Sequence, residues 1–208
     1  MKIKANNQID VRVKKMLSLL LILGVFPGIA PCFADDSQAV DHTGDYQVQV
    51  TGTTTQKTIH YNCNSLNVFV NNGANLDGDV DCNKLTLAIN GLAKATLTGT
   101  ATSVNVQDLN GQGQLDLTGM TIGTLEIAMV NSGAIGRFTI SKNAHVRFLQ
   151  GRGTLYFRAE DDADPMPVVS VDQINGVAWI HQCGVSVRVI GPGGTTGKNG
   201  TILDDCDW

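Results

Sequence analysis

The feature that most constrains the fold of this chain is a repeat of short segments in which every second residue is apolar and a turn containing glycine follows. The spacings between the first residues of these segments are 19, 19, 21, 21, 23 and 16 positions. Period-two alternation is typical of a β-strand with one buried face, and a fixed period of roughly 20 residues is typical of stacked repeats. The sequence therefore predicts an all-β repeat protein. The segments begin at Leu66, Leu85, Val104, Leu125, Val146, Val169 and Val185.

Two architectures fit this pattern. In a single-stranded parallel β-helix, or β-solenoid, of about six to seven coils, each repeat is one coil. In an antiparallel β-sandwich or meander, each Asn-Gly dipeptide is a hairpin turn, and this dipeptide is the strongest short hairpin signal. Asp108 interrupts the alternation ahead of Leu109, which predicts a bulge or a corner there. The solenoid also predicts one interior column, formed by Leu66, Leu85, Val104, Leu125 and Val146.

The cysteine spacing favours the solenoid. Cys63 and Cys82 are one repeat apart, so they would be about 4.8 Å apart in a solenoid and roughly 9.6 Å apart in a meander. A disulfide requires Cα atoms closer than about 7 Å. Cys183 and Cys206 are again separated by nearly one repeat. We therefore expect the disulfides Cys63–Cys82 and Cys183–Cys206, one at each end of the array, where exposed strand edges need closure.

Residues 1–34 are typical of a secretory signal peptide. Lys14 and Lys15 precede a short apolar run over residues 16–26, and small residues around Ala34 suit a signal peptidase. A membrane span needs about 20 apolar residues, and this run is shorter. The alternative to a cleaved signal peptide is a retained anchor helix. Translation can begin at Met1 or at Met16. The even number of cysteines after residue 34 agrees with export to an oxidising compartment.

The rest of the chain divides into N-terminal cap strands (35–62), solenoid repeats (63–190) and a C-terminal loop and cap (191–208). Without residues 1–34 it has 10 basic and 18 acidic residues, a net charge of −8. Nucleic acid and anionic lipid both require a basic surface, so we expect neither as a partner. The capped ends favour a monomer, located in the periplasm or at the surface of a bacterium.

Metal sites have weak support in the sequence. Alternate side chains of a strand share one face, so three alternating aspartates are a candidate calcium site; segments rich in Asn, Gly and Asp are more often plain turns. Two His–Cys pairs have spacings that suit zinc, but disulfides would remove the thiolates. We expect no cofactor. The aspartates are Asp77, Asp79 and Asp81, and the pairs are His60 with Cys63 and His181 with Cys183.

The sharper ligand hypothesis is a glycan. The alternation places Glu126, Arg147 and Arg158 on the outer surface, as a sugar-binding face or as a solvated ion-pair surface. Cleavage would need paired carboxylates, or an arginine base beside acidic groups in one groove. The spacing supports no Ser-His-Asp or Cys-His arrangement. We therefore expect a protein that is not an enzyme, with a carbohydrate-binding or carbohydrate-active protein as the alternative.

The repeats also resemble a known family. Two turns, Gly111-Gln112-Gly113 and Gly151-Arg152-Gly153, each lie between short alternating strands, and Asn-Gly replaces this turn in other repeats. Over roughly residues 64–190 the chain is similar to the head GIN domain family of autotransporter adhesin-like proteins and to related exported β-helical proteins. The resemblance implies a surface-associated solenoid and brings no catalytic residues. With the signal and the repeat, it predicts a structural or adhesive role at the cell envelope, with a cell-surface glycan or an envelope protein as partner.

Overall fold

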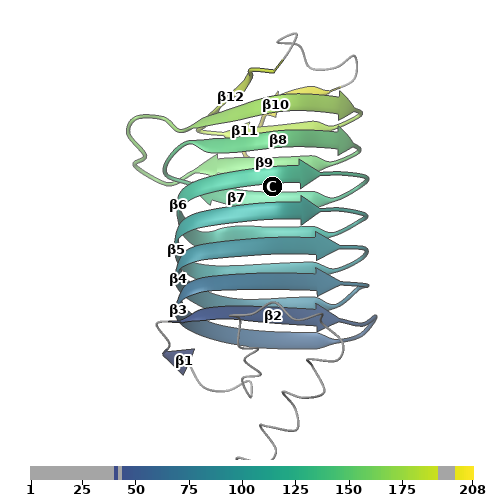
Figure 1. Cartoon of the computed structure of the whole chain (residues 1–208). Helices are drawn as coiled ribbons and strands as arrows, with labels where there is room; N and C mark the ends of the chain where they lie inside the picture. The colour runs from purple at the N-terminus through teal and green to yellow at the C-terminus, as the bar shows by residue number, and fades with distance from the viewer. Residues whose placement is uncertain (1–39, 42–43, 192–199) are drawn as a thin grey trace, which may run out of the picture.

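The computed structural model describes residues 40–41, 44–191 and 200–208. All strand pairings in this part of the chain are parallel, and the strands stack into a β-solenoid of about eight turns (Figure 1). The predicted solenoid is therefore confirmed, with a coil number close to the six or seven expected, and the antiparallel alternative is wrong. The predicted signal peptide and most of the loop that follows Gly191 lie outside the described residues.

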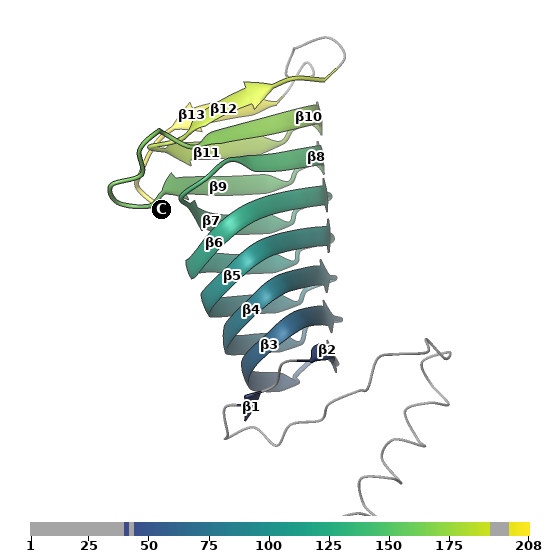
Figure 2. The same ribbon diagram turned by 60° about the vertical axis from the view of Figure 1, so that its left-hand side comes forward.

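Four long strands form most of the N-terminal half of the stack, and each bends around one edge from the back face to the front face of Figure 1 (Figure 2). They are β3 (Gln56–Asn71), β4 (Asn75–Asn90), β5 (Lys94–Leu109) and β6 (Gln114–Val130). The shorter strands each belong to one face. Those of the front face are β2 (Asp45–Thr51), β8 (Ala144–Gly151), β10 (Val168–Gly176) and β12 (Ser186–Val189). Those of the back face are β1 (Val40–Asp41), β7 (Ile135–Ile140), β9 (Thr154–Ala159), β11 (Trp179–Cys183) and β13 (Thr201–Asp204).

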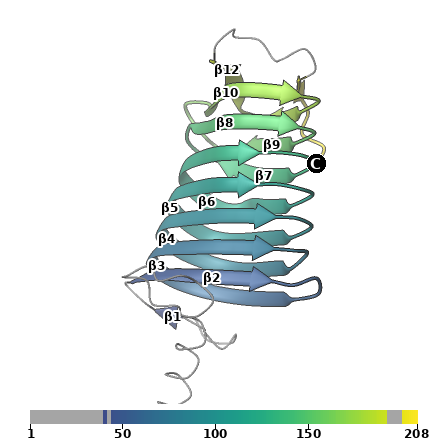
Figure 3. The same cartoon turned by 45° about the vertical axis from the view of Figure 1, so that its right-hand side comes forward.

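Turns at the opposite edge return the chain from the front face to the back face (Figure 3). They carry the Asn-Gly and Gly-x-Gly motifs, and they join the two faces rather than neighbouring strands of one sheet. The turns also stack on one another, because the backbone N–H of Gln112 donates to the Gly91 carbonyl and that of Gly133 donates to the Gly111 carbonyl, both at 2.7 Å. Hydrogen bonds therefore run along the axis at the turns as well as in the strands.

The interior consists of apolar columns that run along the stack. Register pairs Leu66 with Leu85, then Val104, then Leu125, as predicted, and all four are buried. The next position in this column is Ala144 and not Val146, which pairs with Ile127 in the neighbouring column. The prediction for Val146 is wrong because only residues 141–143 connect β7 to β8, so the strand begins earlier than the apolar pattern indicates.

The irregularity predicted at Asp108 is a bulge. Leu87 pairs with Val106, whereas Ala88 pairs with Asp108, so β5 contains one extra residue. The side chain of Asp108 is half-buried in the bulge, and its Oδ1 has no hydrogen-bond partner. Burial raises the pKa of this carboxyl above its ordinary value.

We expect Asp108→Asn to stabilise the protein at pH 7 by about 1 kcal/mol, because a neutral amide costs less to bury than a charged carboxylate does. A raised pKa means that the folded chain keeps this proton to higher pH than the unfolded chain does. The stability of the wild type should therefore fall as pH rises above about 3.9, the ordinary aspartate value, and the variant should lack this contribution. Thermal unfolding across this pH range measures the difference. The exposed Asp161→Asn is the control, and identical pH profiles for Asp108→Asn and the wild type would contradict the prediction.

A glycine within β5 allows two coils to approach closely. Gly99 has a φ of +101°, and a Cβ at this position would lie 2.5 Å from the carbonyl oxygen of Val80 in the preceding coil. We expect Gly99→Ala to lower the free energy of unfolding by about 2 kcal/mol, because it adds backbone strain and a backbone clash. Urea unfolding measures the change. Gly133→Ala is the matched control, since the nearest atom to its Cβ would be 3.6 Å away. Equal effects of the two substitutions would contradict the prediction.

Candidate functional site

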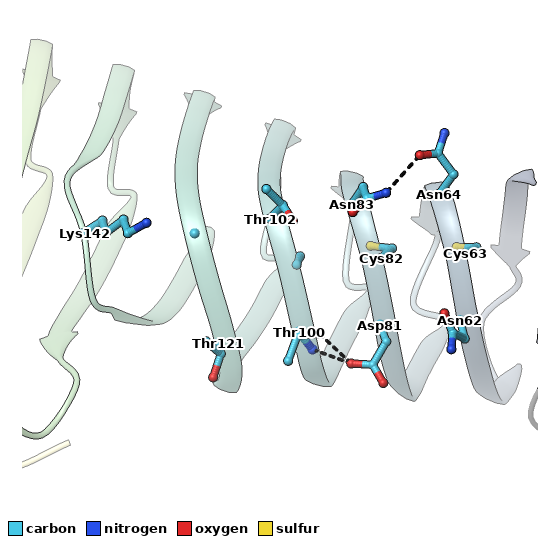
Figure 4. Close-up of a pocket in the computed structure, with 12 residues that line it drawn as sticks. Asn62, Cys63, Asn64, Asp81, Cys82, Asn83, Thr100, Thr102, Thr121 and Lys142 are labelled. Atoms are coloured by element: carbon cyan, nitrogen blue, oxygen red, sulfur yellow. Dashed lines mark hydrogen bonds between the residues drawn. The ribbon is translucent and has the colours of Figure 1, made fainter. Parts of the chain in front are cut away.

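A groove of about 740 Å³ runs along the edge where the long strands bend (Figure 4). It crosses β3, β4, β5 and β6 in turn and reaches the short connection between β7 and β8, so it follows the axis of the stack. Its lining is mostly amides, hydroxyls and thiols. The lining residues are Asn62, Cys63, Asn64, Asp81, Cys82, Asn83, Thr100, Ala101, Thr102, Thr121, Gly123 and Lys142.

One wall of the groove is a column of register partners: Asn62, Asp81, Thr100 and Thr121. Within it, the backbone N–H and the hydroxyl of Thr100 donate to Oδ1 of Asp81 at 3.0 and 2.6 Å. Because the column repeats once per coil, its polar groups recur at the strand spacing of about 4.8 Å.

The other wall contains a ladder of side-chain amides. Asn83 donates from Nδ2 to Oδ1 of Asn64 at 3.1 Å, and Asn64 donates from Nδ2 to Oδ1 of Asp45 at 3.0 Å. Such coil-to-coil hydrogen bonds hold the amides in one orientation. The groove therefore presents fixed hydrogen-bonding groups along several coils.

Two cysteines lie between the walls. Cys63 and Cys82 are register partners in neighbouring coils, with exposed fractions of only 6% and 8%. The hydrogen bond between their side chains lowers the pKa of Cys63 and raises that of Cys82, and burial also raises that of Cys82. The thiols are thus inequivalent, and Cys63 is the one that deprotonates more easily.

The predicted disulfide at the C-terminal end is confirmed: Cys183 and Cys206 are joined, with their Cα atoms 5.1 Å apart. At the other end, Cys63 and Cys82 are the predicted coil-to-coil neighbours, but both are present as free thiols. A disulfide between them stays a prediction.

The three aspartates proposed for calcium do not converge. They occupy alternate positions of one strand, β4, so their backbones span about 13 Å, whereas calcium ligands lie 2.3–2.6 Å from the ion. Asp79 and Asp81 instead accept hydrogen bonds from threonines of β5. In the described residues, no three His, Cys, Asp or Glu side chains are placed to hold a metal ion. The proposed zinc pairs are not assembled either, since His60 is exposed while Cys63 is buried, and Cys183 is in a disulfide.

The proposed glycan face is divided between the two faces of the solenoid. Glu126 of β6 and Arg147 of β8 form an ion pair of 3.0 Å on the front face. Arg158 lies in β9 on the back face, where its Nη2 donates to the Cys206 carbonyl at 3.0 Å. These residues do not form one site, because the turn at residues 151–153 carries the chain from one face to the other. Alternation distinguishes inward from outward positions but does not say which face a position occupies.

An aromatic cluster on the back face was missed by the sequence interpretation. The ring of Tyr156 stacks on that of His181 at 4.3 Å and contacts that of Trp208 at 5.1 Å. Nδ1 of His181 pairs with Oδ2 of Asp205 at 2.9 Å, and the Arg158 guanidinium lies 4.8 Å from the Trp208 ring centroid. The cluster attaches the C-terminal tail to β9 and β11, and the C-terminus lies beside β9 in Figure 2. These residues are far apart in sequence, so no local pattern joins them.

Comparison with known proteins now adds to this geometry. A family model described as "putative auto-transporter adhesin, head GIN domain" matches residues 33–158, more than half of the chain. The chain belongs to this family. The groove lies wholly within the matched region of this head GIN protein, whereas β10–β13 and the Cys183–Cys206 disulfide follow it. Searches of curated proteins and of solved structures gave no match. In the described part of this head GIN protein, no helix is long and apolar enough to cross a membrane.

Proposed function

We propose that this head GIN protein is an exported, non-enzymatic solenoid with a structural or adhesive role at the bacterial cell envelope. The observation that carries the proposal is the match of the family model to the solenoid. The coils of this solenoid are joined by parallel strand pairing and by side-chain hydrogen bonds from one coil to the next. Each coil contacts its neighbours only, so such a stack is a stiff scaffold with long lateral surfaces. The Cys183–Cys206 disulfide supports export, because disulfides persist in oxidising compartments.

The chemistry of the groove does not favour cleavage of a glycan. Asp81 is the carboxylate among its lining residues, and it already accepts two hydrogen bonds from Thr100. Most glycoside hydrolases use two carboxyl groups, one on either side of the scissile bond. The lining suits the binding of polar groups better than their cleavage.

Export and location can be tested directly on cells that express the full chain. We expect the mature N-terminus to follow Ala34, and we expect the protein to be digested when protease is added to intact cells. Deletion of the gene should reduce attachment of the cells to surfaces or to other cells. A product that retains residues 1–34 in the cytoplasm would contradict export, and attachment that is unchanged by deletion would contradict the adhesive role.

The groove favours one second candidate function, the binding of an extended neutral glycan. Its polar side chains recur once per coil along the axis, so successive sugar units of a linear chain would each meet a hydrogen-bonding group. On a glycan array, we expect Asn83→Leu to reduce binding at least about tenfold, the effect of losing about 1.4 kcal/mol. Arg147→Ala, on the front face, should leave binding unchanged. No binding by the wild type to any neutral glycan would exclude this candidate, and equal loss in both variants would place the site elsewhere.

A further inference from the structure

The two free thiols occupy an unusual place, because they are buried in the stack and yet line an open groove. In Figure 4, Cys63 and Cys82 lie side by side between the asparagine ladder and the Asp81 wall. Both positions point inward and are register partners in strands that pair on either side of them, with a gap in the register only at Asn64 and Asn83, so the backbone holds the two cysteines next to each other. A reagent that enters the groove meets the two thiols together.

A disulfide at this position would be under geometric strain. Register partners in parallel strands are related by a simple translation, so their Cβ atoms are separated by about the strand spacing of 4.7–4.9 Å. Disulfides prefer Cβ atoms about 3.5–4.5 Å apart. Closing the bond must therefore draw two coils together at one point, against the backbone pairing of β3 with β4 on both sides of it.

The disulfide at the other end does not have this constraint. Cys183 is the last residue of β11, while Cys206 lies beyond the end of β13 at Asp204, in the C-terminal tail. The tail can place Cys206 without moving a coil, and their Cα atoms are 5.1 Å apart. Strained disulfides have more oxidising potentials and are the ones that exchange, whereas relaxed disulfides resist reduction.

We propose that Cys63 and Cys82 form a reversible thiol–disulfide exchange site whose substrates are small-molecule disulfides that enter the groove. The thiolate of Cys63 attacks one sulfur of the small disulfide, a mixed disulfide forms, and the first small thiol leaves as a thiolate. The thiolate of Cys82 then attacks the sulfur of Cys63 and releases the second small thiol. The dithiol loses two electrons and two protons, and the small disulfide gains them as two thiols. Excess small thiol reverses both steps.

The two steps follow from the pairing of the cysteines. Cys63 and Cys82 are register neighbours, so the second thiol lies beside the sulfur that carries the mixed disulfide, and the lowered pKa of Cys63 agrees with its role as the first nucleophile. Exposed fractions of 6% and 8% restrict access to small reagents. This proposal does not depend on the adhesive role, because it concerns chemistry within a single chain.

Redox titration of the purified exported protein tests the proposal. The protein is equilibrated in buffers with increasing ratios of reduced to oxidised dithiothreitol, free thiols are alkylated, and each cysteine peptide is quantified by mass spectrometry. We expect Cys63 and Cys82 to be half-reduced at a ratio at least tenfold lower than Cys183 and Cys206, which corresponds to about 30 mV. Reduction of both pairs at the same ratio, or of Cys183–Cys206 first, would overturn the proposal.

Single variants test the chemical steps separately from the fold. With oxidised glutathione, Cys82→Ser should accumulate a mixed disulfide on Cys63, whereas the wild type should proceed to the internal disulfide. The Cys183→Ser/Cys206→Ser double variant should still form the internal bond and serves as the control. The circular dichroism spectrum of Cys82→Ser should match that of the wild type. A loss of exchange in this variant can then be assigned to the missing thiol and not to unfolding. Thiols that react only above the unfolding temperature would overturn the proposal.

Discussion

Replacing Phe138 by alanine is expected to lower the free energy of unfolding by about 3–5 kcal/mol. Phe138 is fully buried in β7, and its ring stacks on that of Phe157 in the next coil, with centroids 5.4 Å apart. The cavity left by the ring should persist, because parallel backbone pairing sets the spacing between coils and prevents the stack from closing over it. The cost should therefore be near the upper end of the range.

Urea and thermal unfolding of Phe138→Ala measure this loss, which corresponds to a fall of roughly 10 °C in Tm for a chain of this size. The matched control is Leu92→Ala, because the side chain of Leu92 is 62% exposed in a turn. The control should change stability by no more than about 0.5 kcal/mol. A loss below about 1 kcal/mol for Phe138→Ala would show that the coils can collapse into the space.

Removing the Cys183–Cys206 disulfide should have the second largest effect, about 3 kcal/mol. The bond closes a loop of 23 residues, and its loss restores that freedom to the unfolded chain. It also releases the tail that carries Asp205 and Trp208 against the back face. We expect the last coils to open first, since coils in a stack depend on their neighbours.

The double variant Cys183→Ser/Cys206→Ser measures this effect by thermal unfolding, and limited proteolysis locates the opened segment. Early cleavage is expected beyond β10. The matched control is Cys63→Ser/Cys82→Ser, in which we expect a smaller loss, because a strained bond adds less to stability. A larger loss in the control that disappears under reducing conditions would show that the N-terminal pair is the structural disulfide, and it would also count against the exchange site.

Several properties of this protein follow from its sequence alone. The alternation identifies inward and outward positions, because a strand turns each successive side chain to the opposite side. The 19-residue separation of Cys63 and Cys82 equals one coil and correctly predicts that they are register partners, while the disulfide between them stays a prediction. The broken alternation at Asp108 identifies the bulge. All three are signals local to a strand or to one repeat.

Other properties are decided only by the tertiary structure. Whether an outward residue lies on the front or the back face depends on where each coil bends, and this separates Arg158 from Glu126 and Arg147. The length of each connection sets the register, and it places Ala144 rather than Val146 above Leu125. The groove and the docking of Trp208 need several coils and the tail to be stacked. Alternation specifies which side chains point inward within each strand. A site also requires the position of every coil relative to the next, which only the stacked structure gives.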